Sequence, residues 1–256
     1  MENNLFISLV KPSVQKKEVN YSNAFSRFAL KSIYAGVYLT FVTICAALVG
    51  TYFFDIHPTL AKISYSLTFP IGLMMIVFLN AELATSNMMY MTVGVHQKWL
   101  DFKKAALIVL ACTLFNLIGA TITSFFMSRT GNAHIMTSDS FIMTMVDAKL
   151  SKDFLTLFIE AILANIFVNI AILGQLKTNN DLAKLFFIEV AIFIFVFLGY
   201  EHVIANFGLY TMALFTGNQS NLGLIIIHWI IVFFGNIIGG GICMGLGYSW
   251  LNSESK

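Results

Sequence analysis

Long apolar stretches separated by short polar connections run through most of the chain. A membrane-spanning helix needs about 20 consecutive apolar residues. The pattern predicts six regions of at least that length, at about 28–54, 60–93, 102–127, 154–176, 182–215 and 222–251. The second and fifth regions are longer than one crossing requires, and polar residues interrupt them near 80–87 and 199–206. We therefore expect an all-α membrane protein with six membrane-spanning helices, of which the second and fifth are broken.

Each predicted break contains an acidic residue, Glu82 in FLNAELATSN and Glu201 in FLGYEHVIANF. An ionised carboxylate is costly in hydrocarbon, so such a residue usually faces the bundle interior or a water path. Interrupted spans at corresponding places in two halves are typical of a transport site. The glutamates, with Asn206, could support the breaks by binding freed backbone N–H groups, or they could contact the substrate. Support of the breaks is favoured over substrate contact, because a carboxylate would repel a substrate that is an anion.

The two halves of the chain match in topology. Glu82 and Glu201 are 119 residues apart, and each half has three spans. Because three is an odd number, the second half must enter the membrane from the opposite side, which makes the repeat inverted. We expect one channel domain over 1–256, with an N-terminal segment at 1–27, repeats at 28–128 and 153–251, and a tail at 252–256.

The distribution of basic residues predicts the orientation of the spans. Eleven lysines and arginines fall on the N-terminal side of the predicted membrane, and four fall on the other side: Lys62, Arg129, Lys149 and Lys152. Cytoplasmic loops carry the excess of basic residues. The N-terminal segment and the tail are therefore expected to be cytoplasmic, and the protein is expected in the cell membrane, which in bacteria is the inner membrane.

Composition excludes several other classes. The chain is 58% hydrophobic and 11% charged, whereas a soluble domain carries about 25% charge. A net charge of +2 is too small to indicate nucleic acid. The three cysteines show no CxxC spacing, HExxH is absent, and no second ligand pairs with His202 at helical spacing. We therefore expect no metal, no cofactor and no enzymatic activity.

Three further motifs have alternative interpretations. His202, next to Glu201, is a candidate for proton transfer or a buried histidine that hydrogen-bonds a neighbour. Asn165 and Asn169 share one helix face and could line a path or bridge helices. The last span contains glycines at small-xxx-small spacing, which predicts close helix packing; they are Gly235, Gly239, Gly241 and Gly245.

Four segments together resemble the formate–nitrite transporter family: GLMMIVFLNAELATSN, EAILANIFVNIA, GYEHVIANF and GNIIGGGICMGLGYSWL. The resemblance covers nearly the whole chain and is closest to the hydrosulfide-conducting branch. It implies a homopentamer of aquaporin-like protomers in the lipid bilayer, each with its own pore for a small monovalent anion. Paired Asn-Pro-Ala boxes, which an aquaporin-like pore for neutral solutes would carry, are absent, since no proline lies in either break.

The resemblance also implies roles for individual residues. The family's loop threonine falls on Thr85, its central histidine on His202, and its vestibule lysine and fourth-helix asparagine on Lys149 and Asn165. The hydrophobic constrictions fall on Phe69, Leu73, Leu83 and Phe195.

Two positions depart from the family pattern. The family usually reads G-A-E/D-L-F-T, and here Asn80 replaces the glycine and Ala84 the phenylalanine. This departure favours hydrosulfide over formate and nitrite, with proton-coupled formate or nitrite transport and a non-ionic pore as the alternatives.

Overall fold

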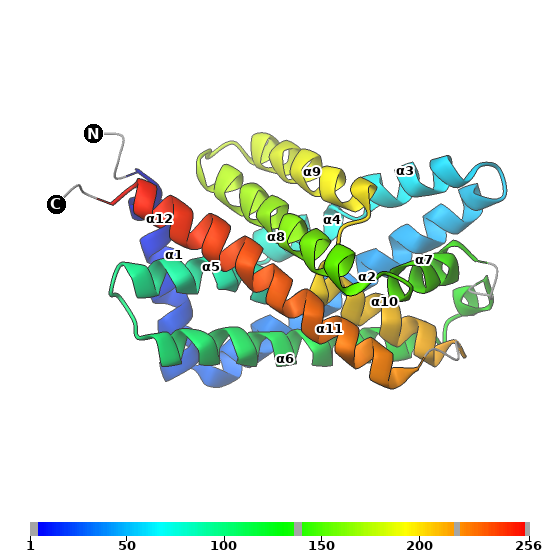
Figure 1. Cartoon of the computed structure of the whole chain (residues 1–256), viewed down its shortest axis with the longest axis horizontal. Helices are drawn as coiled ribbons and strands as arrows, with labels where there is room; N and C mark the ends of the chain where they lie inside the picture. The colour runs from blue at the N-terminus through cyan, green and yellow to red at the C-terminus, as the bar shows by residue number, and fades with distance from the viewer. Residues whose placement is uncertain (1–4, 136–139, 218–220, 254–256) are drawn as a thin grey trace.

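The computed structural model describes residues 5–135, 140–217 and 221–253, and all regular structure in these ranges is helical. Figure 1 shows the spanning helices running along the long axis of the molecule, with both termini at the same end. The elements in chain order are α1 (Leu5–Asn23), α2 (Phe25–Phe54), α3 (Pro58–Thr68), α4 (Ile71–Phe78), α5 (Ala84–His96), α6 (Phe102–Met127), η2 (Gly131–Ile135), α7 (Phe141–Leu150), α8 (Phe154–Leu176), α9 (Asp181–Leu198), α10 (Val203–Phe215), α11 (Leu222–Asn236), the π-helix η3 (Ile237–Leu246) and α12 (Gly247–Leu251).

The described residues contain six candidate membrane crossings, as the apolar pattern predicts. Five helical runs are long and apolar enough by themselves: α2, α3 with α4, α6, α8, and α11 with η3 and α12. The sixth crossing is the pair α9 and α10, which is bent by 57° at its break. Because three crossings precede the connection at 128–153 and three follow it, the second half is inverted relative to the first.

The breaks are shorter than the polar residues suggest. The first covers 79–83, so that Thr85 and Asn87 lie in the first turns of α5, and the second covers 199–202, so that Asn206 lies in α10. Polar residues at a helix N-terminus are easily taken for part of the preceding loop, since these side chains are common in both places.

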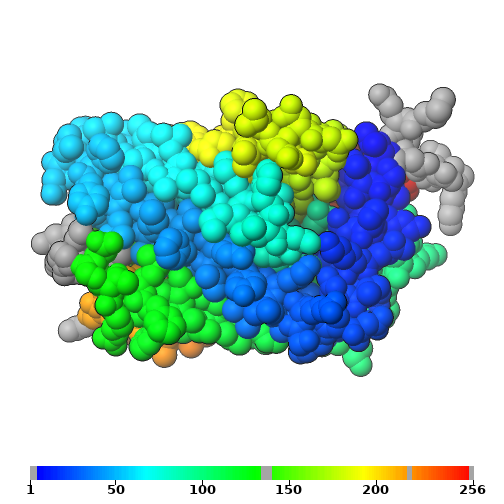
Figure 2. Space-filling model, turned by 180° about the vertical axis from the view of Figure 1, so that it is seen from behind, coloured from blue at the N-terminus to red at the C-terminus, as the bar shows by residue number. Residues whose placement is uncertain are grey.

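The N-terminal segment forms a helix that the sequence pattern did not indicate. Helix α1 lies across one end of the bundle, nearly perpendicular to the spans, and is visible in blue in Figure 2. It buries Phe6, Val10 and Val14. Of the expected segment 1–27 and the expected tail 252–256, residues 1–4 and 254–256 lie outside the described part of the chain.

Glycines allow the spans of each half to approach backbone to backbone. A Cβ atom on Gly119 of α6 would lie 2.1 Å from the Ile33 carbonyl oxygen of α2, and one on Gly239 would lie 2.1 Å from the Ile162 oxygen of α8. Gly241 and Gly245 instead face α5, where a Cβ would lie 2.9 Å from Thr92 and Met89 atoms respectively. The predicted close packing of the last span is confirmed, and it involves two neighbouring helices.

Candidate functional site

The N-termini of the two half-helices α5 and α10 meet inside the bundle. Thr85 lies in the first turn of α5 and His202 immediately precedes α10, and Thr85 Oγ1 is 2.8 Å from His202 Nε2. Both residues are buried, with 0% and 3% of their surface exposed. The helix dipoles put partial positive charge at both N-termini, so this point of the bundle favours a negative or hydrogen-bond-accepting group.

The backbone hydrogen bond of His202 determines which ring nitrogen carries a proton. Nδ1 accepts a hydrogen bond from the Ala205 N–H at 3.2 Å, which makes His202 the N-cap of α10. A nitrogen that accepts a hydrogen bond carries no proton, so the neutral ring has its proton on Nε2. Nε2–H then donates to Thr85 Oγ1, and the Thr85 O–H has no acceptor among the described residues.

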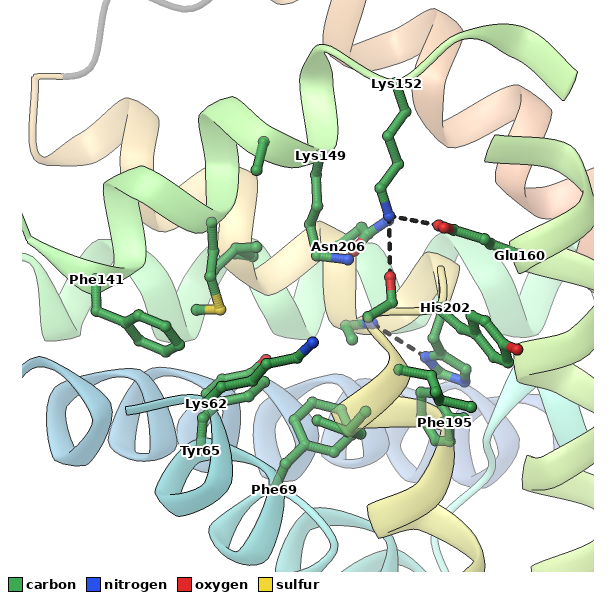
Figure 3. A pocket seen from close by; sticks show the side chains of 18 of the residues that line it. Lys62, Tyr65, Phe69, Phe141, Lys149, Lys152, Glu160, Phe195, His202 and Asn206 are labelled. Carbon is green, nitrogen blue, oxygen red and sulfur yellow. Dashed lines mark hydrogen bonds and ion pairs between the residues drawn. The ribbon is translucent and has the colours of Figure 1, made fainter. Parts of the chain in front are cut away.

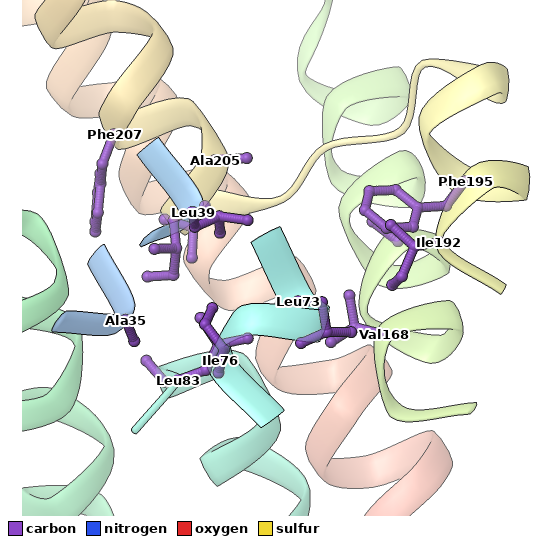
Figure 4. Close-up of a cluster of buried hydrophobic side chains, with 14 of the residues drawn as sticks. Ala35, Leu39, Leu73, Ile76, Leu83, Val168, Ile192, Phe195, Ala205 and Phe207 are labelled. Carbon is purple, nitrogen blue, oxygen red and sulfur yellow. The ribbon is translucent and has the colours of Figure 1, made fainter. Parts of the chain in front are cut away.

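Four apolar side chains of the broken helices are buried at this level of the chain or close to it in sequence. Phe69 and Phe195 stand edge to face with ring centroids 6.1 Å apart, and Phe195 lies 6.2 Å from the His202 ring. Leu73 and Leu83 belong to the buried cluster shown in Figure 4, with 3% and 2% of their surface exposed. The four residues that the resemblance assigns to constrictions are therefore all buried apolar side chains of the two broken helices.

Above the Phe69–Phe195 pair lies a cavity of about 390 Å³, which we call the Lys149 vestibule. Glu201 is fully buried beside it and accepts hydrogen bonds from Lys149 Nζ at 2.9 Å, Lys152 Nζ at 2.6 Å and Asn206 Nδ2 at 2.7 Å. Lys152 also pairs with Glu160, as Figure 3 shows. Lys149 is thus an ion-paired lysine and not a free cation.

The two lysines differ in how firmly they hold their protons. Burial lowers the pKa of Lys149, although Glu201 opposes this effect. Burial also acts against Lys152, but the charges of Glu201 and Glu160 raise its pKa above the ordinary value. Lys152 is therefore the more persistently charged partner of the Glu201 carboxylate.

A second vestibule, the Lys17 vestibule, lies at the end covered by α1 and has a volume of about 210 Å³. Lys17 of α1 donates to Glu82 at 2.5 Å and lies 5.1 Å from the ring centroid of Tyr90. Asn87 also donates to Glu82, at 3.3 Å. Each break thus presents the same arrangement, in which a buried glutamate binds a lysine and the asparagine five residues after it.

This arrangement corrects one expectation about the glutamates. Among the described residues, neither carboxylate accepts a hydrogen bond from a backbone N–H group. Each instead neutralises a lysine of a neighbouring element, because an ammonium group offsets the cost of burying a carboxylate better than a neutral amide does.

Two asparagines, one on the third span of each half, satisfy the freed backbone groups: Asn116 at the first break and Asn236 at the second. The sequence pattern did not single them out. Asn116 accepts from the Ala84 N–H at 3.0 Å and donates to the carbonyl oxygens of Glu82 at 2.9 Å and Ser32 at 2.6 Å. Their separation of 120 residues, almost equal to that of the two glutamates, was the available sequence signal.

Asn236 does the same at the second break. It accepts from the Val203 N–H at 2.9 Å and donates to the carbonyl oxygens of Ala161 at 2.7 Å and Glu201 at 3.0 Å. Each asparagine therefore ties a half-helix N-terminus to the first span of its own repeat.

Asn165 and Asn169 bridge helices at this level of the bundle. Asn165 Nδ2 donates to the carbonyl oxygens of Asn236 at 2.7 Å and Thr85 at 3.2 Å, and Asn169 Nδ2 donates to Asn165 Oδ1 at 3.0 Å. Asn165 is fully buried. Its amide group donates to the Thr85 carbonyl oxygen and so holds the backbone of α5 in place.

Asn80 keeps the backbone conformation that the first break needs. Its φ is +55°, and the corresponding Gly199 of the second break has φ +78°. Asparagine is one of the few residues besides glycine that adopt the left-handed region without a large penalty. The departure from the family's glycine therefore leaves the turn intact and adds a polar side chain to the Lys17 vestibule.

Two inverted three-helix repeats, with broken helices that meet at a buried polar pair, define an aquaporin-like membrane channel or transporter. The model of the formate/nitrite transporter family matches residues 8–250, and the chain belongs to this family.

Individual relatives agree with this assignment. The nitrite transporter NirC of Escherichia coli (strain K12) is 29% identical over 232 residues, which are 90% of this chain and 85% of that protein. A solved FNT family ion channel has a TM-score of 0.89 at 25% identity and covers 97% of this chain and 98% of its own. A pentameric formate channel with formate bound has a TM-score of 0.73 at 24% identity, covering 89% and 97%, and shows the shared fold.

Proposed function

We propose that this protein conducts a small monovalent anion across the cell membrane, with hydrosulfide as the first candidate and formate and nitrite as the next. The observation that carries the proposal is the Thr85–His202 pair at the meeting point of two half-helix N-termini. Two converging positive dipole ends and a free hydroxyl proton suit an anion or the conjugate acid of one. Nitrite transport by NirC and the formate bound to the pentameric channel support a substrate of this size and charge.

The apolar constrictions favour passage as the neutral acid. A bare anion does not cross rings of buried Phe and Leu side chains cheaply. The anion takes up a proton from water in the vestibule and passes Phe69 and Phe195 as the neutral acid. The acid is held by Thr85 at the centre, passes Leu73 and Leu83, and releases the proton to water on the other side. Hydrogen sulfide is the weakest acid of the three candidates and is therefore the easiest to form near neutral pH, which places hydrosulfide first.

We also propose the assembly and orientation. The pentameric state of the formate channel supports a homopentamer with one path in each protomer. Both termini lie at the same end of the bundle, next to the Lys17 vestibule, and the excess of lysine and arginine on that side supports a cytoplasmic location. The Lys149 vestibule then faces outward.

Flux into liposomes tests the function directly. Purified protein is reconstituted, and the initial rates for hydrosulfide, formate, nitrite and chloride are compared with those of empty liposomes. We expect hydrosulfide to be fastest and chloride, which has no weak conjugate acid, to be slowest. Fast formate or nitrite with slow hydrosulfide would restrict the substrate to those two anions, and the absence of flux for all four would overturn the proposed function.

His202→Asn separates the two roles that the sequence left open for this histidine. Asparagine is a favoured N-cap residue, so α10 is expected to start normally and the variant to fold. If His202 only donates a hydrogen bond to Thr85, flux falls by roughly two- to ten-fold, which corresponds to one lost hydrogen bond. The pH profile of the flux then stays that of the wild type, because the substrate sets it. A shifted or flattened profile in the folded variant would instead identify His202 as the proton donor.

A further inference from the structure

Some of the charged side chains in and beside the Lys149 vestibule form ion pairs with one another. Lys149 and Lys152 bind Glu201, and Lys152 also binds Glu160, so that two ammonium groups face two carboxylates. This group of four has no net charge. An anion that approaches the vestibule therefore gains little from Lys149 or Lys152, whose charges are already neutralised at close range.

Lys62 of α3 lines the same vestibule and has no such partner. No carboxylate of the described residues lies within 4.0 Å of its ammonium nitrogen. The nitrogen lies 5.0 Å from the ring centroid of Phe197, and the side chain is exposed. Figure 3 shows Lys62 extending into the vestibule from the side opposite Lys149 and Lys152. Lys62 therefore supplies the surplus positive charge of the vestibule.

Helix α3 and the turn that follows it place three different groups along one face. Lys62, Tyr65 and Phe69 are spaced i, i+3 and i+7, so their side chains follow one another down one side of the cavity. Tyr65 is 8% exposed, and its hydroxyl makes no hydrogen bond with the described residues. Its ring is held against Phe69 at 5.8 Å and Phe141 at 5.9 Å. The order from the mouth inward is a cation, a free hydroxyl donor and the constriction.

We propose that Lys62 and Tyr65 form an outer binding site for the substrate anion, ahead of the Phe69–Phe195 constriction. The inference rests on the proposed anion conduction and adds the residues that recruit the anion. Lys62 attracts it from solution, and the Tyr65 hydroxyl donates a hydrogen bond that replaces one from water. Lys149 and Lys152 hold Glu201 and the second break in position.

The salt dependence of flux tests Lys62. The probe is the anion that the wild type conducts fastest among the four compared above, and half-saturating concentrations are measured at about 10 mM and about 1 M ionic strength, where screening differs strongly. Lys62→Gln is expected to raise the half-saturating concentration by about two- to five-fold at low salt, the range for one exposed charge interaction, with little effect at high salt. Arg129→Gln, which removes an exposed cation outside the vestibule, is the matched control and is expected to match the wild type.

Tyr65→Phe tests the hydroxyl independently of charge. It is expected to raise the half-saturating concentration by about two- to ten-fold at both salt concentrations, as the loss of one hydrogen bond would. If wild-type flux is normal while Lys62→Gln matches Arg129→Gln at both salts, the outer site is overturned and the proposed function stands. If the wild type conducts none of the four anions, both fail.

Charge rescue distinguishes recruitment from a structural role of Lys62. Lys62→Cys is treated with a methanethiosulfonate that carries either an aminoethyl or a sulfonatoethyl group, and the wild type is treated in parallel because Cys45 and Cys243 are exposed. The aminoethyl adduct is expected to restore the low-salt half-saturating concentration, and the sulfonatoethyl adduct to raise it further. Equal effects of the two adducts would overturn the proposal, because a structural role depends on size and not on the sign of the charge.

Discussion

Replacement of Asn236 by leucine is expected to prevent the second break from forming correctly and to abolish flux. Leucine has a similar size but no polar atom, so the Val203 N–H and the carbonyl oxygens of Ala161 and Glu201 lose their partner inside the bundle. Each buried group left unsatisfied costs about 1–3 kcal/mol, and the lipid interior offers no water as a replacement. The measurements are the melting temperature of the purified protein in detergent and anion flux in liposomes.

The same test can be made at the first break, where Asn116 takes the place of Asn236. Asn116→Leu removes the equivalent hydrogen bonds at the first break and is expected to lower the melting temperature by a similar amount. Asn179→Leu, at an exposed position between α8 and α9, is the control and is expected to leave both properties unchanged. A stable, conducting Asn236→Leu variant would contradict the role assigned to the two asparagines.

Glu201→Gln is expected to cause the second large loss of stability. The substitution keeps the shape of the side chain but leaves Lys149 and Lys152 with only Glu160 to balance them. Removal of one partner from a buried ion pair costs about 3–5 kcal/mol, since the remaining charge stays buried and unpaired. Glu82→Gln is expected to cost less, because Lys17 belongs to the peripheral helix α1 and can turn toward water. Thermal unfolding of the two variants in detergent compares the effects.

A second substitution tests whether charge imbalance is the cause. In Glu201→Gln with Lys149→Met, Lys152 and Glu160 remain as a balanced pair, so the double variant is expected to melt at a higher temperature than Glu201→Gln alone. The non-additive part of the change measures the Lys149–Glu201 coupling. A double variant that melts lower than Glu201→Gln would show that the hydrogen bonds of Lys149, and not its charge balance, carry the stability.

The sequence was sufficient for the features that depend on local composition and order. Six apolar stretches of spanning length, two of them interrupted by polar residues, predict the crossings and the breaks, because hydrocarbon accepts only apolar segments with internally satisfied backbones. The odd number of spans in each half makes the repeat inverted. The glycine spacing of the last span predicts close packing, and the structure confirms it at Gly239.

The partners of the buried polar groups depended on the tertiary structure. Lys17 and Glu82 are 65 residues apart, and Asn116 meets the Ala84 N–H across 32 residues. Neither Asn116 nor Asn236 has a neighbour in sequence that marks it as a backbone partner, and polar residues are frequent enough in spans that their 120-residue separation did not stand out. Helix α1 also went unrecognised, since its apolar residues are few and become useful only against the end of the bundle.

The sequence by itself therefore determined the membrane architecture and the approximate positions of the breaks, since these follow from hydropathy. The resemblance to the family, which rests on motifs of adjacent residues, singled out Thr85, His202 and Lys149 as candidates. The tertiary structure alone decided that Lys149 is neutralised by Glu201 while Lys62 is not. It also decided that the two glutamates bind lysines while Asn116 and Asn236 bind the backbone of the breaks. The physical reason is that a charge or a hydrogen-bonding group acquires its role from what lies within a few ångströms of it. In a helical bundle those neighbours come from helices that are far apart in the chain.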